Sequence, residues 1–140
     1  MKNILHSALN NFFVHMVGIE LEIKDIFEVR ECYISKIELK GDINYDAYLF
    51  STVGFLQKMS SIFLFIDDPD EDTLKDLNNE MLNIVIGNAK CIYSEIGTHF
   101  AISTPKFIGI GEKLLNLKEI SFSSAIYESE EIKISLMERQ

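Results

Sequence analysis

Four polar or small residues fall on one side of a predicted helix in the middle of the chain. Asp76, Glu80, Asn83 and Gly87 follow one another at intervals of four, three and four residues, which places them in one row along a helix. A carboxylate can pair with a cation, and an amide can donate one hydrogen bond while it accepts another. Because the apolar residues of the same helix lie on a different side, we expect another molecule to dock on this row.

The helix that carries the row is predicted to begin at Asp68 and to end before Gly97. Asp68 is the expected N-cap, with Pro69 at the first helical position and Glu71 completing a capping box. At 100° per residue, the apolar side chains of this segment cover a separate arc that is expected to face the core. These residues are Leu74, Leu77, Met81, Leu82, Ile84, Val85, Ile86, Ala89 and Ile92.

A bare Glu-x-x-Asn pair is weak evidence of function, because 14 Glu and 9 Asn in this chain make about one such pair expected by chance. The longer pattern is much rarer. It runs Asp76-x-x-x-Glu80-x-x-Asn83, continues with Gly87-Asn88-Ala89-Lys90 and, after a gap of 21 residues from Asn83, reaches Pro105. It resembles the phosphatase signature of the CheC/CheX/FliY family of bacterial chemotaxis proteins, in which the gap is about twenty-two residues. A loop can absorb the difference of one residue.

The resemblance implies a substrate, a reaction and a role for each residue. The substrate would be the phosphorylated receiver of a CheY-like response regulator, and the reaction would be hydrolysis of its aspartyl phosphate. Asn83 would orient the attacking water, and Glu80 would pair with the receiver lysine. Asp76, Gly87 and Pro105 would contact the partner around them. The receiver already holds Mg²⁺, so the chain is expected to need no metal or cofactor of its own.

Two functions of other classes stay open. A CheX-like module can bind receivers or other proteins without hydrolysing anything, as an adaptor or as a sink in the phosphate pathway. A purely structural interaction protein would pair through its sheet and bind no receiver. The resemblance also implies a homodimer formed through sheet edges.

Composition limits the class of partner and the location. With 140 residues, 47% of them apolar, the chain is expected to form a single domain over residues 1–140. A net charge of −9 disfavours nucleic acid and anionic membranes as partners. The longest apolar run, residues 62–66, is far shorter than the roughly 20 residues of a membrane span. Without a leader pattern at the N-terminus, we expect a cytoplasmic protein with reduced cysteines. The acidic run at residues 67–72 lacks the glycine and spacing of an EF-hand, and helix capping accounts for it.

The remaining pattern predicts an α+β fold, with long helices packed on a mainly antiparallel sheet. Helical spacing predicts one helix over residues 3–17, ending at Gly18, and a buried one over residues 53–65. Gly109 and Gly111 are expected to mark a loop. Strands are predicted over residues 19–23, 33–39, 45–51, 100–103, 119–127 and 131–137. Turn residues at 41–44 and 128–131 predict two hairpins.

Overall fold

The computed structural model describes residues 2–24, 31–111 and 117–139. Within these residues, seven strands form an antiparallel sheet in the order β1-β6-β7-β3-β2-β4, and β5 also pairs with β2. The strands are β1 Glu22–Lys24, β2 Cys32–Gly41, β3 Tyr45–Thr52, β4 Phe100–Ile102, β5 Lys106–Gly111, β6 Glu119–Tyr127 and β7 Glu130–Glu138. The helices are α1 Lys2–Asn10 with the π-helical η1 Asn11–Val17, α2 Val53–Met59 with the π-helical η2 Ser60–Leu64, and α3 Glu71–Glu95.

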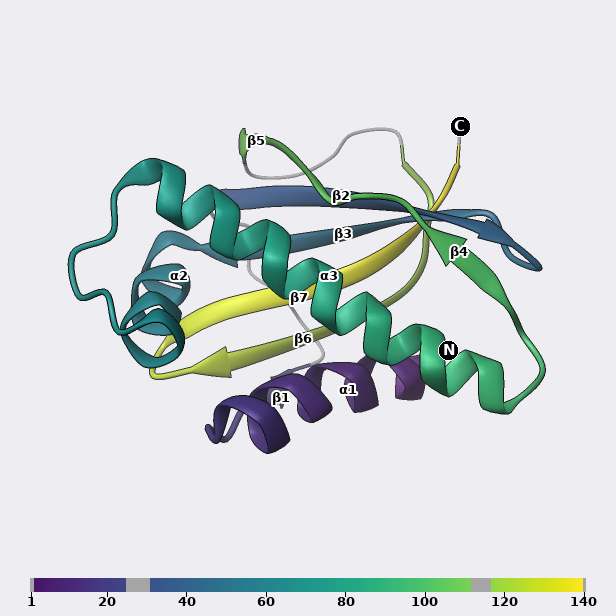
Figure 1. The fold of residues 1–140 in the computed structure, drawn as a ribbon, viewed down its shortest axis with the longest axis horizontal. Helices are drawn as coiled ribbons and strands as arrows, with labels where there is room; N and C mark the ends of the chain where they lie inside the picture. The colour runs from purple at the N-terminus through teal and green to yellow at the C-terminus, as the bar shows by residue number, and fades with distance from the viewer. Residues whose placement is uncertain (1, 25–30, 112–116, 140) are drawn as a thin grey trace.

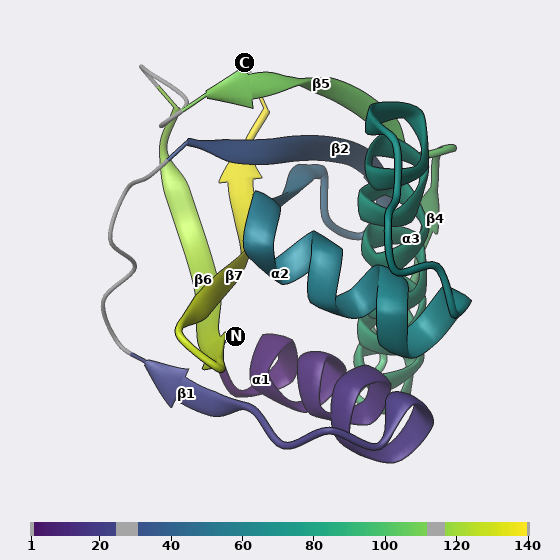
Figure 2. The same cartoon turned by 90° about the vertical axis from the view of Figure 1, so that its left-hand side faces the viewer.

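The helices gather on one face of the curved sheet (Figures 1 and 2). This arrangement confirms the predicted α+β fold with a mainly antiparallel sheet. The helix predicted over residues 3–17 is present as α1 and η1, and Gly18 ends it with a positive φ of 88°. The helix predicted over residues 53–65 is present as α2 and η2, but it is not buried throughout, because Leu64 and Phe65 at its end are 36% and 88% exposed.

Both predicted hairpins are present. In the first, β2 and β3 pair from Cys32 opposite Thr52 to Glu38 opposite Asp46. In the second, β6 and β7 are joined by Glu128 and Ser129, both with positive φ, as a two-residue hairpin turn requires. This turn is shorter than the predicted residues 128–131, because β7 already begins at Glu130.

The sequence prediction was wrong at two places in the sheet. Gly109 and Gly111 lie in β5 and not in a loop. Gly109 has a φ of 151° and lies where the register of β5 against β2 shifts. It therefore belongs to a β-bulge, where glycine can adopt this positive φ. The strand predicted over residues 19–23 is reduced to β1, which pairs with β6 only from Glu22 to Lys24.

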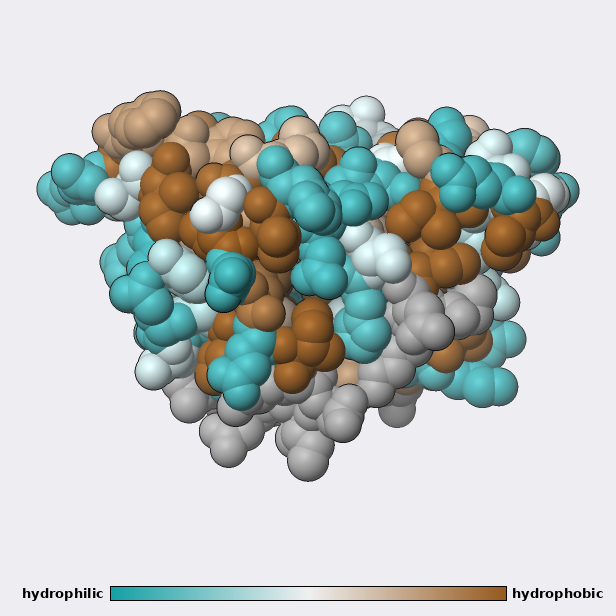
Figure 3. Space-filling view, turned by 90° about the horizontal axis from the view of Figure 1, so that it is seen from below, coloured by the Kyte–Doolittle hydropathy of each residue, from teal (hydrophilic) through white to brown (hydrophobic). Residues whose placement is uncertain are grey.

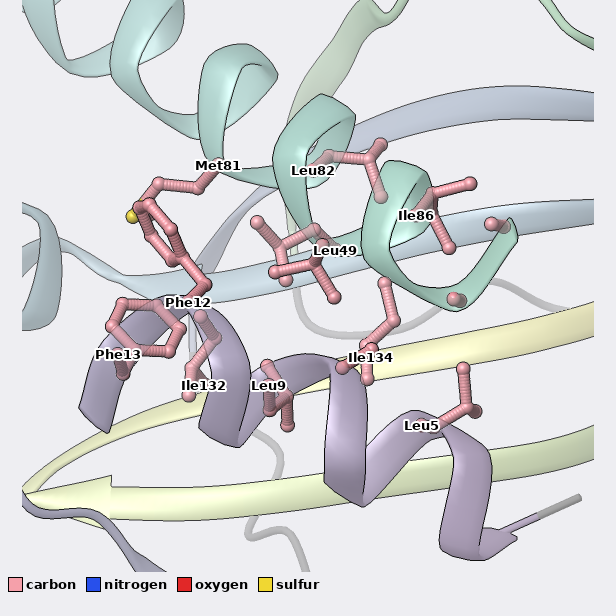
Figure 4. Packing of buried hydrophobic residues seen from close by; sticks show 14 of the residues in the cluster. Leu5, Leu9, Phe12, Phe13, Leu49, Met81, Leu82, Ile86, Ile132 and Ile134 are labelled. Atoms are coloured by element: carbon pink, nitrogen blue, oxygen red, sulfur yellow. The ribbon is translucent and has the colours of Figure 1, made fainter. Parts of the chain in front are cut away.

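The main core lies between the helices and the sheet. Side chains of α1 and η1 meet those of α3 over the central strands β3 and β7 (Figure 4). The labelled residues are all buried: Leu5, Leu9, Phe12, Phe13, Leu49, Met81, Leu82, Ile86, Ile132 and Ile134. A smaller cluster on the other face of the sheet contains Cys32, Ile34, Tyr48, Phe50 and Met137. The central strands are therefore covered on both faces, which makes them a rigid support for α3.

Candidate functional site

The helix that carries the polar row begins two residues later than the sequence predicts. Asp70, and not Asp68, is the N-cap, and its Oδ1 accepts a hydrogen bond of 2.8 Å from the backbone N–H of Thr73. This backbone hydrogen bond is the main reason that the pKa of Asp70 lies below its ordinary value. Pro69 therefore precedes the cap and does not open the helix. The helix ends at Glu95, close to the predicted stop at Gly97.

One face of α3 is buried against the sheet and α1, largely as the helical wheel predicts. The buried residues are Leu74, Leu77, Asn78, Met81, Leu82, Val85, Ile86, Ala89 and Tyr93. Ile84 and Ile92, which were predicted to face the core, are only half-buried at the margin of that face. Asn78 was not among the predicted core residues. Its position could have been recognised, because it falls about 160° from Glu80 on the wheel and so lies on the apolar arc.

Asn78 ties α3 to the two central strands below it. Its Oδ1 accepts a hydrogen bond of 2.7 Å from the hydroxyl of Ser51 on β3, and its Nδ2 donates one of 2.8 Å to the hydroxyl of Ser35 on β2. The Ser35 hydroxyl in turn donates a hydrogen bond of 2.6 Å to Oδ1 of Asn79. Ser35, Ser51 and Asn78 are each 0% exposed. This network fixes the rotation of α3 about its own axis.

The same rotation presents the predicted row at the surface. Asp76 and Glu80 are exposed, and Asn83 is half-buried. Within residues 2–24, 31–111 and 117–139, the side chains of these three residues make no hydrogen bond or ion pair. Glu80 and Asn83, three positions apart on a helix, have Cβ atoms about 5–6 Å apart. A carboxylate and an amide are thus available side by side to one bound molecule.

Gly87 continues the row one turn beyond Asn83. A Cβ atom added there would meet no atom within 4 Å, so open space lies above this turn of the helix. Pro105 is half-buried in the link between β4 and β5. Four of the five predicted site residues therefore lie on α3, and the fifth, Pro105, lies outside this helix, between β4 and β5.

A groove of about 300 Å³ adjoins the N-terminal half of the row. It is lined by Phe63 and Leu64 of η2 and by Thr73, Asp76, Leu77 and Glu80 of α3. One wall is apolar, and the other carries the two carboxylates of the row. Among the described residues, no group of three or more His, Cys, Asp or Glu side chains is arranged to hold a metal ion. The chemistry available at this site is that of a carboxylate, an amide and a shaped groove.

The sequence model of one protein family, Chemotaxis phosphatase CheX, matches residues 33–124, a span that contains the whole of α3 and Pro105. The chain belongs to the CheX family. No curated protein sequence matches it. The family match covers the long pattern from Asp76 to Pro105, so the resemblance noted from that pattern is confirmed.

Solved structures of CheX and CheC-like proteins share the fold of this CheX family member. Chemotaxis protein CheX from Vibrio vulnificus matches with a TM-score of 0.83 and 19% identity, over 96% of this chain and 93% of that one. A CheC-like superfamily protein from Shewanella sp. PV-4 matches with a TM-score of 0.76 and 20% identity, over 96% and 95%. A CheX–CheY–BeF₃–Mg²⁺ complex from Borrelia burgdorferi matches with a TM-score of 0.76 and 16% identity, over 98% and 97%. At these identities the likeness is one of fold.

As in any CheX family member, the function must be argued from the site and not from the fold alone. In this chain the site consists of Glu80 and Asn83 at the surface of α3, with Asp76 and the groove before them and open space at Gly87 after them. Within the described residues, no helix has both the length and the apolar character to span a membrane.

Proposed function

We propose that this chain is a phosphatase that binds the phosphorylated receiver of a CheY-like response regulator and hydrolyses its aspartyl phosphate in the cytoplasm. The observation that carries the proposal is the pairing of Glu80 and Asn83 on the exposed side of α3. Both side chains are free of other polar partners within the described residues, while a buried network holds the helix in that rotation. The choice of partner is supported by the CheX of Borrelia burgdorferi, which shares this fold and forms a complex with CheY.

The reaction requires little covalent chemistry from this chain. A water oxygen forms a bond to phosphorus, the bond from phosphorus to the aspartate oxygen breaks, and the products are inorganic phosphate and a free aspartate carboxylate. The protons of the water end on the phosphate and the solvent. The Mg²⁺ of the receiver supplies charge neutralisation at the phosphoryl group. The missing element is a water molecule held in line with the breaking bond, and positioning of this kind can account for a large part of a barrier.

Asn83 is assigned to that water. Its amide oxygen accepts a hydrogen bond from the water, and its NH₂ group donates one to the receiver, which fixes the water without a covalent intermediate. Asn83 is half-buried on α3, the helix that the Asn78 network holds against β2 and β3. Asn83 thus acts as a catalytic residue through orientation.

Glu80 is assigned to docking. Its exposed carboxylate pairs with the receiver lysine, a charge-assisted contact that orients the helix in the receiver site. Asp76 adds a second carboxylate one turn earlier, and Gly87 leaves room for close approach one turn after Asn83. Pro105 is proposed as a further contact at the rim, on the strength of the family pattern.

We also propose that two copies of the chain pair through sheet edges. β5 lies at one edge of the sheet, where it pairs only with β2 among the described strands. Ile108 and Ile110 of β5 are about two-fifths exposed. An exposed edge strand with apolar side chains is a ready site for pairing with another strand. Analytical ultracentrifugation of the wild-type chain and of Ile108→Lys measures this directly, and a monomeric wild-type chain would contradict it.

The experiment that tests the proposed function is the lifetime of phosphorylated receivers. Each receiver of the same cell is phosphorylated, and loss of its phosphate is followed with and without this chain and with Asn83→Ala. The proposal predicts that at least one receiver loses phosphate faster with the wild-type chain, and that Asn83→Ala abolishes most of the acceleration. Binding of a receiver without any Asn83-dependent loss of phosphate would instead identify a non-catalytic adaptor or sink.

A further inference from the structure

Three consecutive apolar residues protrude beside the candidate site. Leu64, Phe65 and Ile66, called here the Phe65 turn, are 36%, 88% and 40% exposed. Phe65 has a φ of 59°, in the left-handed region that residues other than glycine and asparagine rarely adopt. Phe65 is the C-cap of η2, so its left-handed backbone ends that helix. The cap does not explain why a bulky, exposed phenylalanine stands where glycine or asparagine is usual, and this choice of side chain suggests a functional requirement.

The Phe65 turn is built into a defined shape. The backbone N–H groups of Phe65 and Ile66 both donate to the carbonyl oxygen of Ser60. The Ser60 hydroxyl, which is buried, donates back to the carbonyl oxygen of Ile66 at 2.9 Å. Ser61 adds a hydrogen bond of 2.6 Å to the carboxylate of Asp67. The turn is therefore held at both ends, and Phe65 is presented outward by its surroundings.

The position of this turn links it to the polar row. Phe63 and Leu64 form the apolar wall of the 300 Å³ groove, and Asp76 and Glu80 form part of the opposite wall. In Figure 1, α2 and η2 lie at the left end of the molecule. Figure 3, which shows the molecule from below, has hydrophobic side chains toward the same end. A groove with one apolar and one acidic wall suits a lysine, whose methylene groups cover apolar surface while its ammonium group reaches a carboxylate.

We propose that the Phe65 turn is a second docking contact for the receiver, in which Phe65 packs on apolar surface next to the lysine that pairs with Glu80. This inference rests on the proposed function, because it takes the receiver as the partner. The charge of the chain favours that partner over a second copy of itself. Five acidic residues follow the turn, and a second copy would bring the same charges to the groove. They are Asp67, Asp68, Asp70, Glu71 and Asp72.

The test replaces Phe65 by asparagine. Asparagine tolerates a positive φ, so Phe65→Asn keeps the turn and removes only the apolar side chain. Ile96→Ala is the matched control, because Ile96 is 67% exposed and lies about 24 Å along α3 from Glu80. Each variant is measured for its thermal midpoint, its affinity for a receiver carrying Mg²⁺ and beryllium fluoride, and its single-turnover rate at saturation.

We expect Phe65→Asn to weaken the affinity by roughly 10- to 50-fold, in the range of an aromatic contact at the centre of an interface. Its thermal midpoint should stay at or above that of the wild type, and its saturating rate should stay within about twofold, because Glu80 and Asn83 are unchanged. The affinity of Ile96→Ala should match the wild type. Added salt should weaken receiver binding by Phe65→Asn and by the wild type to the same extent. Glu80→Gln should make receiver affinity less dependent on salt.

The outcomes separate this inference from the proposed function. If the wild-type chain hydrolyses the phosphate and Phe65→Asn binds as tightly as the wild type, only the docking contact is overturned. If the wild-type chain binds a receiver in a Phe65-dependent way and hydrolyses nothing, the docking contact stands and the phosphatase proposal fails. A wild-type chain that binds no receiver overturns both. A change in oligomeric state on Phe65→Asn, with receiver affinity unchanged, would assign the turn to contact between copies and overturn the inference.

Discussion

Replacing Asn78 by alanine should destabilise the protein by about 3–4 kcal/mol, a large effect for the loss of one polar side chain. Asn78→Ala removes two short hydrogen bonds, one from Ser51 and one to Ser35. Each contributes about 1 kcal/mol net. The hydroxyl of Ser51 is then left buried without this partner, which adds about 1–2 kcal/mol. The hydroxyl of Ser35 keeps Asn79 as its acceptor and adds nothing further.

Two controls isolate this network. Asn79→Ala removes a single hydrogen bond and leaves the buried hydroxyl of Ser35 without its acceptor, so it should cost about 2–3 kcal/mol, one hydrogen bond less than Asn78→Ala. In the double variant Asn78→Ala/Ser51→Ala, the hydrogen bond between the two residues is lost only once and no Ser51 hydroxyl is stranded, so the combined cost should be at least about 2–3 kcal/mol less than the sum of the single costs. Urea unfolding, followed by circular dichroism, gives each free energy of unfolding from the midpoint and slope.

Two results would contradict this prediction: a cost of Asn78→Ala below about 1 kcal/mol, or simple additivity of the Asn78 and Ser51 substitutions. Either result would mean that the buried network does not hold α3 against β2 and β3. The outward presentation of Glu80 and Asn83 would then need another explanation.

Three further predictions concern α3. Leu82→Ala, at a fully buried position, should cost about 3 kcal/mol, while Ile84→Ala at the half-buried margin should cost about 1 kcal/mol; equal costs in urea unfolding would mean that the helix is rotated from the described orientation. Asp70→Ala should lower the thermal midpoint at pH 7, and Asp68→Ala should not. The pKa of Asp70 is lower in the folded chain, so its stabilisation is complete above its ordinary value of 3.8 and is lost as the pH falls through the folded value; a deficit of Asp70→Ala that stays constant down to pH 2 would contradict the cap. Gly87→Leu should fold normally, because a Cβ there meets nothing, yet slow receiver dephosphorylation at least about 10-fold; an unchanged rate would show that the receiver does not approach this turn.

The sequence predicted most of the fold because its periodicities are strong. Strict alternation in residues 119–127 and 131–137 marks strands with one face on the core, and turn residues between such runs set the pairing. The N-cap was placed wrongly because two aspartates flank Pro69 and each can cap a helix. The choice of Asp70 depends on the backbone path out of the Phe65 turn, which has no sequence signature. Gly109 was predicted to lie in a loop because glycine with a positive φ is typical of both loops and β-bulges, and the sequence does not distinguish them.

Only part of the candidate site could be predicted from the sequence. The row from Asp76 to Gly87 lies on one helix, so helical spacing alone places its members together. The groove does not follow from spacing, because it requires η2 to lie against the first turns of α3. The burial of Asn78 could have been predicted from its place on the apolar arc, but its role could not, because the serines that bind it lie on β2 and β3, far away in the sequence.

The central claim is that Asn83 orients water for hydrolysis of a receiver's aspartyl phosphate while Glu80 supplies a docking charge. Its most direct test is the single-turnover rate of dephosphorylation by Asn83→Ala, measured at saturating receiver beside the affinity for the receiver–beryllium fluoride complex. The account predicts a rate slower by roughly 100-fold or more with an unchanged affinity, whereas Glu80→Ala loses affinity as well as rate. Dephosphorylation by both variants at the wild-type rate would contradict it.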